Sequence, residues 1–265
     1  MFDHEGNAFL SQGKFVTRLK PDGTSQVWAE TGAPDGHRVM ADDSHLICDD
    51  HAAIFHLDKN GKLIGKITEA DGKPLRVPND LALDPKGGFY FTDPGDSGKK
   101  PTGSVGYVDS GWHAHIIAGG LRYSNGVVLR PDGKTLLVGE SELNHILEYP
   151  VLAPGKLGTP KVFATLPSKG PGQIANSPDG MCLDADGNLY IAHYGMGQVE
   201  VVNPQGKLIR SYRTGLLTTS NVAFGGPRMD QLYVTGGIGA EGKTPGGLVR
   251  LDLPGVRGLT ILPSR

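Results

Sequence analysis

The chain of 265 residues carries 26 Lys and Arg against 28 Asp and Glu, which gives a formal net charge of −2 at pH 7. This near balance supplies no electrostatic attraction to nucleic acid or to an anionic membrane. No apolar run reaches the length that crosses a bilayer. We therefore expect neither class of partner, and we expect a monomer or a weak dimer.

The two cysteines, Cys48 and Cys182, each fall within an apolar segment. That placement is typical of buried free thiols and not of a disulfide. The first ten residues, MFDHEGNAFL, have neither the basic start nor the apolar core of a secretion signal. Both observations predict a cytoplasmic protein.

The first 30 residues have the pattern of one repeat without its opening strand. Asp3–Asn7 matches the DxxGN pattern of a hairpin turn, and only Met1 and Phe2 precede it. Three β-rich segments that we predict to be strands follow, at residues 8–11, 14–19 and 25–29.

After this segment a phrase recurs five times: a polar residue, an apolar strand, a turn and a second strand. The polar residues that open the phrases, here called head residues, are Asp35, Asn79, Asn125, Asp179 and Asn221. Their spacings of 44, 46, 54 and 42 residues are close to the period of four-stranded propeller blades. Pro- and Gly-rich stretches at 95–103, 152–160 and 167–174 are expected to be loops beside the strands.

These elements predict an all-β chain that forms a six-bladed β-propeller, with residues 1–265 as a single domain. The first blade is expected to lack most of its innermost strand. No segment has the pattern of an amphipathic helix. A propeller suits many short strands because it leaves only short, protected sheet edges.

In a propeller the first strand of each blade lines the central channel, so the head residues are expected to gather at one end of it. Asn79, Asn125 and Asp179 would then offer two amide oxygens and one carboxylate. Oxygen donors of this kind suit Ca²⁺, Mg²⁺ or Mn²⁺, and Zn²⁺ also accepts them. The alternative is structural, because Asn and Asp often bond their own backbone in turns.

Four segments resemble the corresponding blades of the family of senescence marker protein (regucalcin, SMP-30), gluconolactonase and luciferin-regenerating enzyme. They are RVPNDLALDPKGGFYFTDP, YSNGVVLRPDGKTLLVGES, NSPDGMCLDADGNLYIAHYGMGQVEVVNP and NVAFGGPRMDQLYVTGG. The resemblance implies a six-bladed propeller with one divalent metal ion, most often Ca²⁺, and activity as a lactonase. Carried over by motif, it makes Asn79, Asn125 and Asp179 the metal ligands.

The chain departs from the family at one position. The usual remaining ligand is a Glu in an EGP phrase at the start of the first blade, and no such phrase is present. Glu5 lies in the predicted hairpin turn and is a poor substitute. Either the sequence is an N-terminally shortened form, or the metal is held by three protein ligands and more water.

The resemblance implies hydrolysis of a lactone or related small ester, with Asp179 as the candidate general base for an activated water. Alternatives are a non-catalytic binding or scaffold propeller with a degraded metal site, an organophosphate hydrolase and a condensing enzyme on the same fold. A Ser nucleophile is not indicated, because no GxSxG phrase occurs.

Four residues are candidates for contacting the substrate: His193, Tyr194, Arg76 and His37. His193 and Tyr194 end a predicted strand, where packing is the alternative role. Arg76 lies three residues before Asn79, whereas relatives place a substrate-contacting Arg two residues before it. His37 follows the head residue Asp35, and the alternative is a surface or packed histidine.

Overall fold

The computed structural model describes residues 1–98, 100–239 and 245–259. Strands dominate these ranges, and the one helical segment within them is a single 3-10 turn, η1 (Ser141–Leu143). No helix in the described part of the chain is long and apolar enough to span a bilayer.

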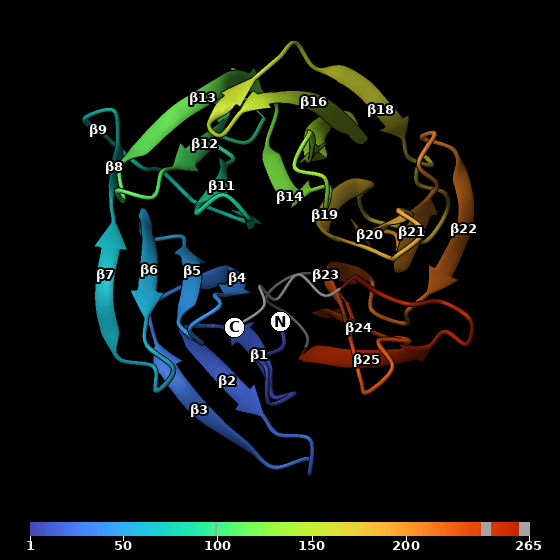
Figure 1. Ribbon diagram of the computed structural model, residues 1–265. Helices are drawn as coiled ribbons and strands as arrows, with labels where there is room; N and C mark the ends of the chain where they lie inside the picture. The colour runs from blue at the N-terminus through green and yellow to red at the C-terminus, as the bar shows by residue number, and fades with distance from the viewer. Residues whose placement is uncertain (99, 240–244, 260–265) are drawn as a thin grey trace. The chain divides into compact units, whose positions relative to one another are not determined.

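Six successive antiparallel sheets follow one another along the chain (Figure 1). This confirms the predicted fold class, a six-bladed β-propeller, and each sheet is called a blade. Blade 1 has three strands, β1 (Ala8–Gln12), β2 (Phe15–Leu19) and β3 (Ser25–Glu30). Within the described ranges, Phe2 forms an isolated bridge to Ala8 beside this blade, and the expected loss of most of its innermost strand stays a prediction.

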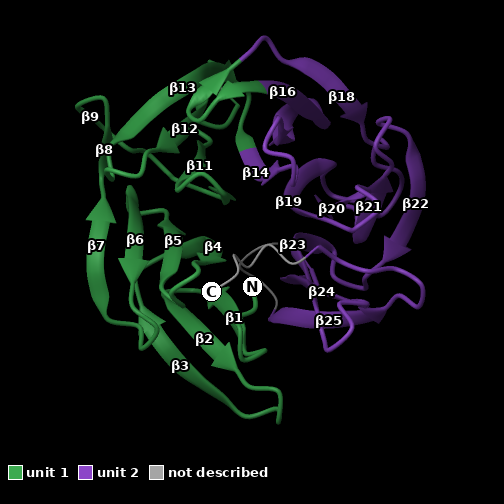
Figure 2. Ribbon diagram, in the orientation of Figure 1, with its two compact units in different colours: residues 1–124, 151–157, 261–265 green, residues 125–150, 158–260 purple. Residues whose placement is uncertain are grey.

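Among the described residues, unit 1 contains residues 1–98, 100–124 and 151–157, and unit 2 contains residues 125–150, 158–239 and 245–259 (Figure 2). These are two compact units, and a single domain over residues 1–265 stays a prediction.

Blades 2 and 3 lie in unit 1. Their strands are β4 (Pro34–Val39), β5 (His45–Asp49), β6 (Ala53–Leu57), β7 (Leu63–Ile67), β10 (Leu81–Asp84), β11 (Gly88–Asp93), β12 (Gly103–Val108) and β13 (Ala114–Leu121), with the hairpin β8 (Glu69–Ala70) and β9 (Lys73–Pro74) between the blades.

Blade 4 begins at the boundary of the units and lies mostly in unit 2, except for residues 151–157, which belong to unit 1. Unit 2 also holds blades 5 and 6. Blade 4 contains β14 (Ser124–Leu129), β15 (Thr135–Glu140), β16 (His145–Ala153), β17 (Lys156–Leu157) and β18 (Lys161–Thr165). Blades 5 and 6 contain β19 (Ser177–Leu183), β20 (Leu189–Tyr194), β21 (Gln198–Val202), β22 (Leu208–Arg213), β23 (Thr218–Gly225), β24 (Gln231–Gly237) and β25 (Gly246–Asp252).

Hairpin turns of the predicted DxxG type connect the first two strands of several blades. In blade 5 the Gly187 amide donates to the Asp184 carbonyl at 3.0 Å, and Gly187 has a φ of +80°. The Asp184 carboxylate accepts the backbone amides of Asp186 and Asn188. Asp184 is therefore structural, because it satisfies the turn that starts the second strand.

The core of each unit lies between neighbouring blades. In unit 1, Leu46 of blade 2 packs with Leu81 and Phe91 of blade 3. In unit 2, Leu137 of blade 4 packs with Leu189 of blade 5. Burial of these side chains between flat sheets is the main favourable term that holds adjacent blades together.

A histidine pair of blade 2 packs against aromatic rings of blade 1. His37 Nε2 lies 2.7 Å from His45 Nδ1, and the rings of Phe9 and Trp28 lie 4.6 and 4.4 Å from the His45 ring. Burial lowers the pKa of His45 to about 4, although Asp3 and Asp43 act in the opposite direction. Burial, and then the neighbouring His45, lower the pKa of His37 well below its usual value.

Glycines allow the heads of adjacent blades to approach closely. A Cβ atom on Gly36 would lie 2.4 Å from the Asn79 carbonyl oxygen, and one on Gly126 would lie 2.2 Å from the Asp179 carbonyl oxygen. A Cβ atom on Gly180 would lie 2.1 Å from Asn221 Oδ1. The glycine that follows one head residue therefore lies directly against the next head residue within the same unit.

We predict that acid destabilises the protein through the histidine pair. The unfolded imidazole of His45 takes up a proton near its ordinary pKa of about 6.5, whereas the folded one does so only near about 4. This contribution to the free energy of unfolding is complete above about pH 6.5 and is lost as the pH falls toward about 4. Protonation of His45 alone should therefore lower the free energy of unfolding by about 1 kcal/mol between about pH 7.5 and about pH 5.5. Urea unfolding at the two pH values measures the loss. The exposed-site control His113→Asn should behave like the wild type, and an unchanged urea midpoint would contradict the prediction.

We predict that Gly126→Ala destabilises unit 2 by about 1–3 kcal/mol, because the new methyl group collides with the Asp179 backbone. Gly139 of the same blade is a matched control, since its nearest neighbour to a Cβ would be 3.6 Å away. Thermal unfolding followed by circular dichroism should give a lower Tm for Gly126→Ala and a nearly unchanged Tm for Gly139→Ala. Equal Tm values for the two variants would show that Gly126 is not in close contact with the Asp179 backbone.

Candidate functional site

In unit 1 the head residue Asn79 is held by the head residue of the preceding blade. Asn79 Nδ2 donates to Asp35 Oδ2 at 2.7 Å, and the Asn79 carbonyl accepts the Gly36 amide at 2.8 Å. A carboxylate can only accept hydrogen bonds, so this contact fixes which branch of the amide carries the nitrogen. The oxygen Oδ1 therefore occupies the other branch and is the atom available to a cation.

The neighbouring carboxylate, Asp80, is engaged differently. Arg38 Nη2 lies 3.3 Å from Asp80 Oδ1, and both side chains are buried. The Leu81 amide also donates to Asp80 Oδ1, at 2.9 Å. Asp80 is thus neutralised by a buried guanidinium, and we assign it to structure and not to the metal site.

In unit 2 the glycine after a head residue approaches the head residue of the next blade. Gly126 of blade 4 lies against Asp179 of blade 5, and Gly180 of blade 5 lies against Asn221 of blade 6. Asn125 is 7% exposed, and its neighbour Gly126 lies against the Asp179 carbonyl. Two of the three predicted ligands, Asn125 and Asp179, therefore belong to adjoining heads. Asn221, the third head in this unit, accepts the Val222 amide with Oδ1 at 2.8 Å, so its side chain caps its own strand.

The chemistry of these donors fits a hard divalent cation. No group of three or more His, Cys, Asp or Glu side chains in the described ranges could hold a metal ion. The predicted set consists instead of two amides and one carboxylate. Oxygen donors of this type suit Ca²⁺ and Mg²⁺.

Arg76 is exposed at the entrance to blade 3. Its backbone amide donates to Asp93 Oδ2 at 2.8 Å, and its guanidinium Nη2 lies 2.8 Å from Asp96 Oδ2. The Arg76 and Asp96 side chains are 44% and 52% exposed. An ion pair this exposed is weak, so the guanidinium can leave Asp96 at little cost.

His37 does not have the surroundings of a substrate contact. It is 5% exposed, and its Nε2 atom is bonded to His45. Its Nδ1 atom is buried and has no hydrogen-bond partner within the described ranges. The rings of Phe9, Trp28 and His45 lie next to the His37 ring. His37 was expected either to contact the substrate or to be a surface or packed histidine, and these contacts favour packing.

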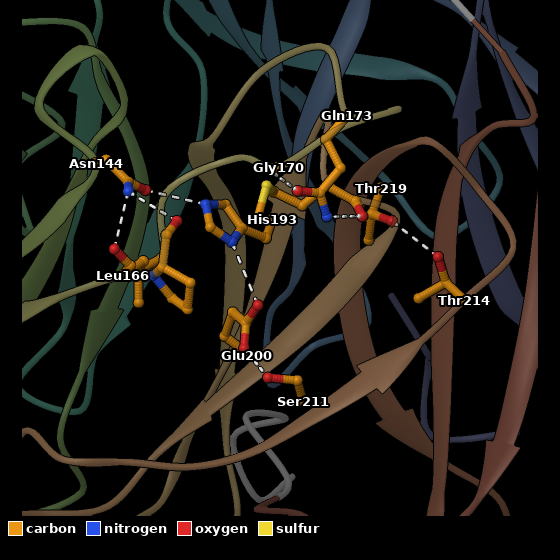
Figure 3. Close-up of polar contacts among 11 residues, drawn as sticks. Asn144, Leu166, Gly170, Gln173, His193, Glu200, Ser211, Thr214 and Thr219 are labelled. Atoms are coloured by element: carbon orange, nitrogen blue, oxygen red, sulfur yellow. Dashed lines mark hydrogen bonds and ion pairs between the residues drawn. The ribbon is translucent and has the colours of Figure 1, made fainter.

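His193 is likewise packed, within a polar network in unit 2 (Figure 3). It is fully buried; its Nε2 lies 2.9 Å from Asn144 Oδ1 and its Nδ1 lies 3.4 Å from Glu200 Oε1. Both ring nitrogens face protein atoms, which favours the packing interpretation over direct contact with a substrate. Tyr194, the next residue, is partly exposed at the end of β20.

The sequence interpretation missed Asn144 and Glu200. Asn144 follows η1 with a φ of +53°, a conformation that Asn tolerates better than most residues. Glu200 is fully buried in the strand QVEVV, where a charged residue at an inward position was the available signal. Asp35 was recognised as a head residue, but its bond to Asn79 depends on two blades meeting and has no local sequence signal.

Comparisons with known proteins identify the family of the chain. Residues 11–237 match the model of the SMP-30/gluconolactonase/LRE-like region. Lactonase drp35 of Staphylococcus aureus is 36% identical over 218 residues, and lactonase drp35 of Staphylococcus epidermidis is 31% identical over 216 residues. These alignments cover 77% of this chain and 65% of each relative, so the chain spans just under two thirds of the length of these curated relatives.

The solved structure of XC5397, a gluconolactonase from Xanthomonas campestris, superposes with a TM-score of 0.79 and 26% identity. The superposition covers 94% of this chain and 83% of that one. The match of the family model to most of the chain, together with these relatives, gives the identification: this chain belongs to the SMP-30/gluconolactonase/LRE-like family.

Proposed function

We propose that the protein hydrolyses a lactone or a related small ester, and that the reaction depends on a divalent cation bound by Asn79, Asn125 and Asp179. Membership in a family with relatives named lactonase and gluconolactonase supports the reaction class. The observation that carries the metal site is the chemistry of the head residues, above all the Asn79 amide whose nitrogen is fixed by Asp35.

The ligand set decides which cations to expect. Two neutral amide oxygens and one carboxylate form a set of hard donors with a low total charge. Such a set favours Ca²⁺ with additional water ligands, and it also accepts Mg²⁺, Mn²⁺ or Zn²⁺. Asp35 acts one step further out, because it holds a ligand and need not itself contact the ion.

The reaction needs a nucleophile, charge stabilisation and a proton acceptor. A cation held by Asn79, Asn125 and Asp179 would supply Lewis acidity toward the carbonyl oxygen of the lactone. Asp179, which is partly exposed, takes a proton from the attacking water. The water oxygen bonds to the carbonyl carbon, the ring C–O bond breaks, and Asp179 returns the proton to the ring oxygen, so that a hydroxy acid leaves.

Two residues are proposed to contact the substrate. Arg76 has a weakly held guanidinium that can turn from Asp96 to an electronegative group of the substrate. Tyr194 is partly exposed and lies directly across the β19–β20 pair from Ser177, two residues before Asp179. His37 and His193 are not included, because their ring nitrogens serve the protein interior.

We place the protein in the cytoplasm because Cys48 and Cys182 are both buried and neither forms a disulfide. Burial raises the pKa of the Cys48 thiol well above its usual value, and Asp80 and Asp35 add to the effect. A thiol of this kind is inert and compatible with a reducing compartment.

We predict that Asp179→Asn abolishes hydrolysis and weakens metal binding, because it removes the carboxylate of the ligand set and the base together. The test is metal content after dialysis, followed by a pH-indicator screen of lactones. Asp186→Asn, an exposed turn substitution in the same blade, should retain activity and metal. Wild-type turnover and metal content in Asp179→Asn would remove Asp179 from the mechanism, and a metal-free, inactive wild type would favour the scaffold alternative.

We also predict that Asp35→Asn lowers metal affinity about tenfold, in line with the effect of removing a group that orients a ligand. An amide at position 35 can donate to Asn79 Oδ1 and so turn the wrong atom toward the ion. Isothermal titration with Ca²⁺ measures the affinity without requiring substrate. Asp50→Asn, an exposed change in the same blade, should leave the affinity unchanged, and equal affinities in the two variants would reject the role of Asp35.

A further inference from the structure

The segment 166–176 connects β18 to β19 and leads directly to the head residue Asp179. Its beginning is bound by Asn144 (Figure 3). Asn144 Nδ2 donates to the Leu166 and Pro167 carbonyls at 3.0 and 3.1 Å, and the Leu166 amide donates to the Asn144 carbonyl at 3.0 Å. Since both amide hydrogens are used in this way, Asn144 Oδ1 can only be the acceptor for His193.

The end of the same segment is bound to the turn between β20 and β21. Gln173 Nε2 donates to the Met196 carbonyl at 3.0 Å, and the Ile174 amide donates to the Gly195 carbonyl at 2.9 Å. A Cβ on Gly195 would lie 2.3 Å from the Ala175 nitrogen, so glycine is needed for this approach. The segment is thus attached to blade 4 at its start and to blade 5 at its end.

His193 is common to both attachments. Its Nε2–H donates to Asn144 at 2.9 Å, and its carbonyl accepts the Met196 amide at 3.1 Å. Its cross-strand partner in the β19–β20 register is Pro178, the residue before Asp179. One buried residue therefore connects the two ends of the segment with the start of the strand that carries the predicted base, through its side chain on one side and its backbone on the other.

Glu200 and Ser211 hold the imidazole in this orientation. Glu200 is fully buried; its Oε1 lies 3.4 Å from His193 Nδ1, and its Oε2 accepts a hydrogen bond from Ser211 Oγ. A carboxylate buried this completely is costly unless it is paired and hydrogen-bonded. The metal chemistry does not use this carboxylate, so its retention calls for a role that the proposed mechanism does not supply.

We propose that the buried His193–Glu200 pair is a positioning device that fixes segment 166–176, through Asn144, and thereby fixes Asp179 for hydrolysis. The last step rests on the proposed function, whereas the fixing of the segment does not. His193 and Glu200 are positioning residues, because neither faces the substrate.

Limited proteolysis tests the proposal without substrate or metal. Lys169 is an exposed trypsin site inside the segment, and Lys207 is an exposed site in the turn between β21 and β22. The double variant His193→Phe/Glu200→Met replaces both partners with apolar groups, which avoids leaving one buried charge unpaired. We expect cleavage after Lys169 to become about fivefold faster, as for the loss of one net hydrogen bond, while cleavage after Lys207 is unchanged.

A second variant separates positioning from general damage. Asn144→Asp keeps an acceptor for His193 but removes both donors to Leu166 and Pro167, so it should also accelerate cleavage after Lys169 selectively. The control Glu148→Met, on β16 outside the network, should change neither rate. No acceleration at Lys169 in the two test variants, or equal acceleration at both lysines, would overturn the proposal.

Kinetics then address the link to Asp179. With an active lactone substrate, both test variants should lower kcat more than they raise KM, and Glu148→Met should change neither constant. Selective cleavage at Lys169 in a protein without lactonase activity would reject the proposed function and retain the positioning device. Unchanged kcat together with selective cleavage would reject the link to Asp179.

Discussion

The close contact between a glycine and the next head residue is the constraint on which the candidate site depends. A strand head can approach the backbone of its neighbour only where no Cβ intervenes, and Gly36, Gly126 and Gly180 provide that space within their units. The contacts place Asn79 beside Asp35 and Asn125 beside Asp179. Head residues at equivalent places in neighbouring blades of one unit thereby lie next to each other and offer adjacent oxygen donors.

The surrounding charges separate structural carboxylates from the proposed functional one. Asp80 is paired with Arg38, Asp184 closes a turn, and Glu200 is enclosed by His193 and Ser211. Each of these carboxylates is satisfied by donors within its own unit, which is the condition for burying it. Asp179, which we propose as ligand and base, is partly exposed at the head of its strand.

The sequence predicted the blades well because their signals are local. Alternating apolar residues and DxxG turns define strands without reference to distant residues, and the observed β1, β2 and β3 nearly reproduce the predicted bounds of residues 8–11, 14–19 and 25–29. The short hairpin β8–β9 was not predicted, because its two-residue strands carry almost no pattern.

The candidate site was predictable only in part. Head residues could be found from their period, but their partners could not, because Asp35 is 44 residues from Asn79 and Asn144 is 49 residues from His193. His193 and His37 show the limit most clearly. A histidine at a strand end has the same local pattern whether it faces a ligand or a buried carboxylate, and only the neighbouring blades decide which.

The strand β16 has a consequence for how the chain comes apart. It begins in unit 2 with residues 145–150 and ends in unit 1, where the β16–β17 hairpin places Gly155 against the ring of Tyr107. Tyr107 in turn donates to Asp84 at 3.1 Å, so the hairpin is tied to blade 3. No single cut in the polypeptide yields the two units as intact fragments. A fragment of residues 1–124 would lack the hairpin residues 151–157 that belong to unit 1, whereas a longer fragment that includes them would also contain residues 125–150 of unit 2.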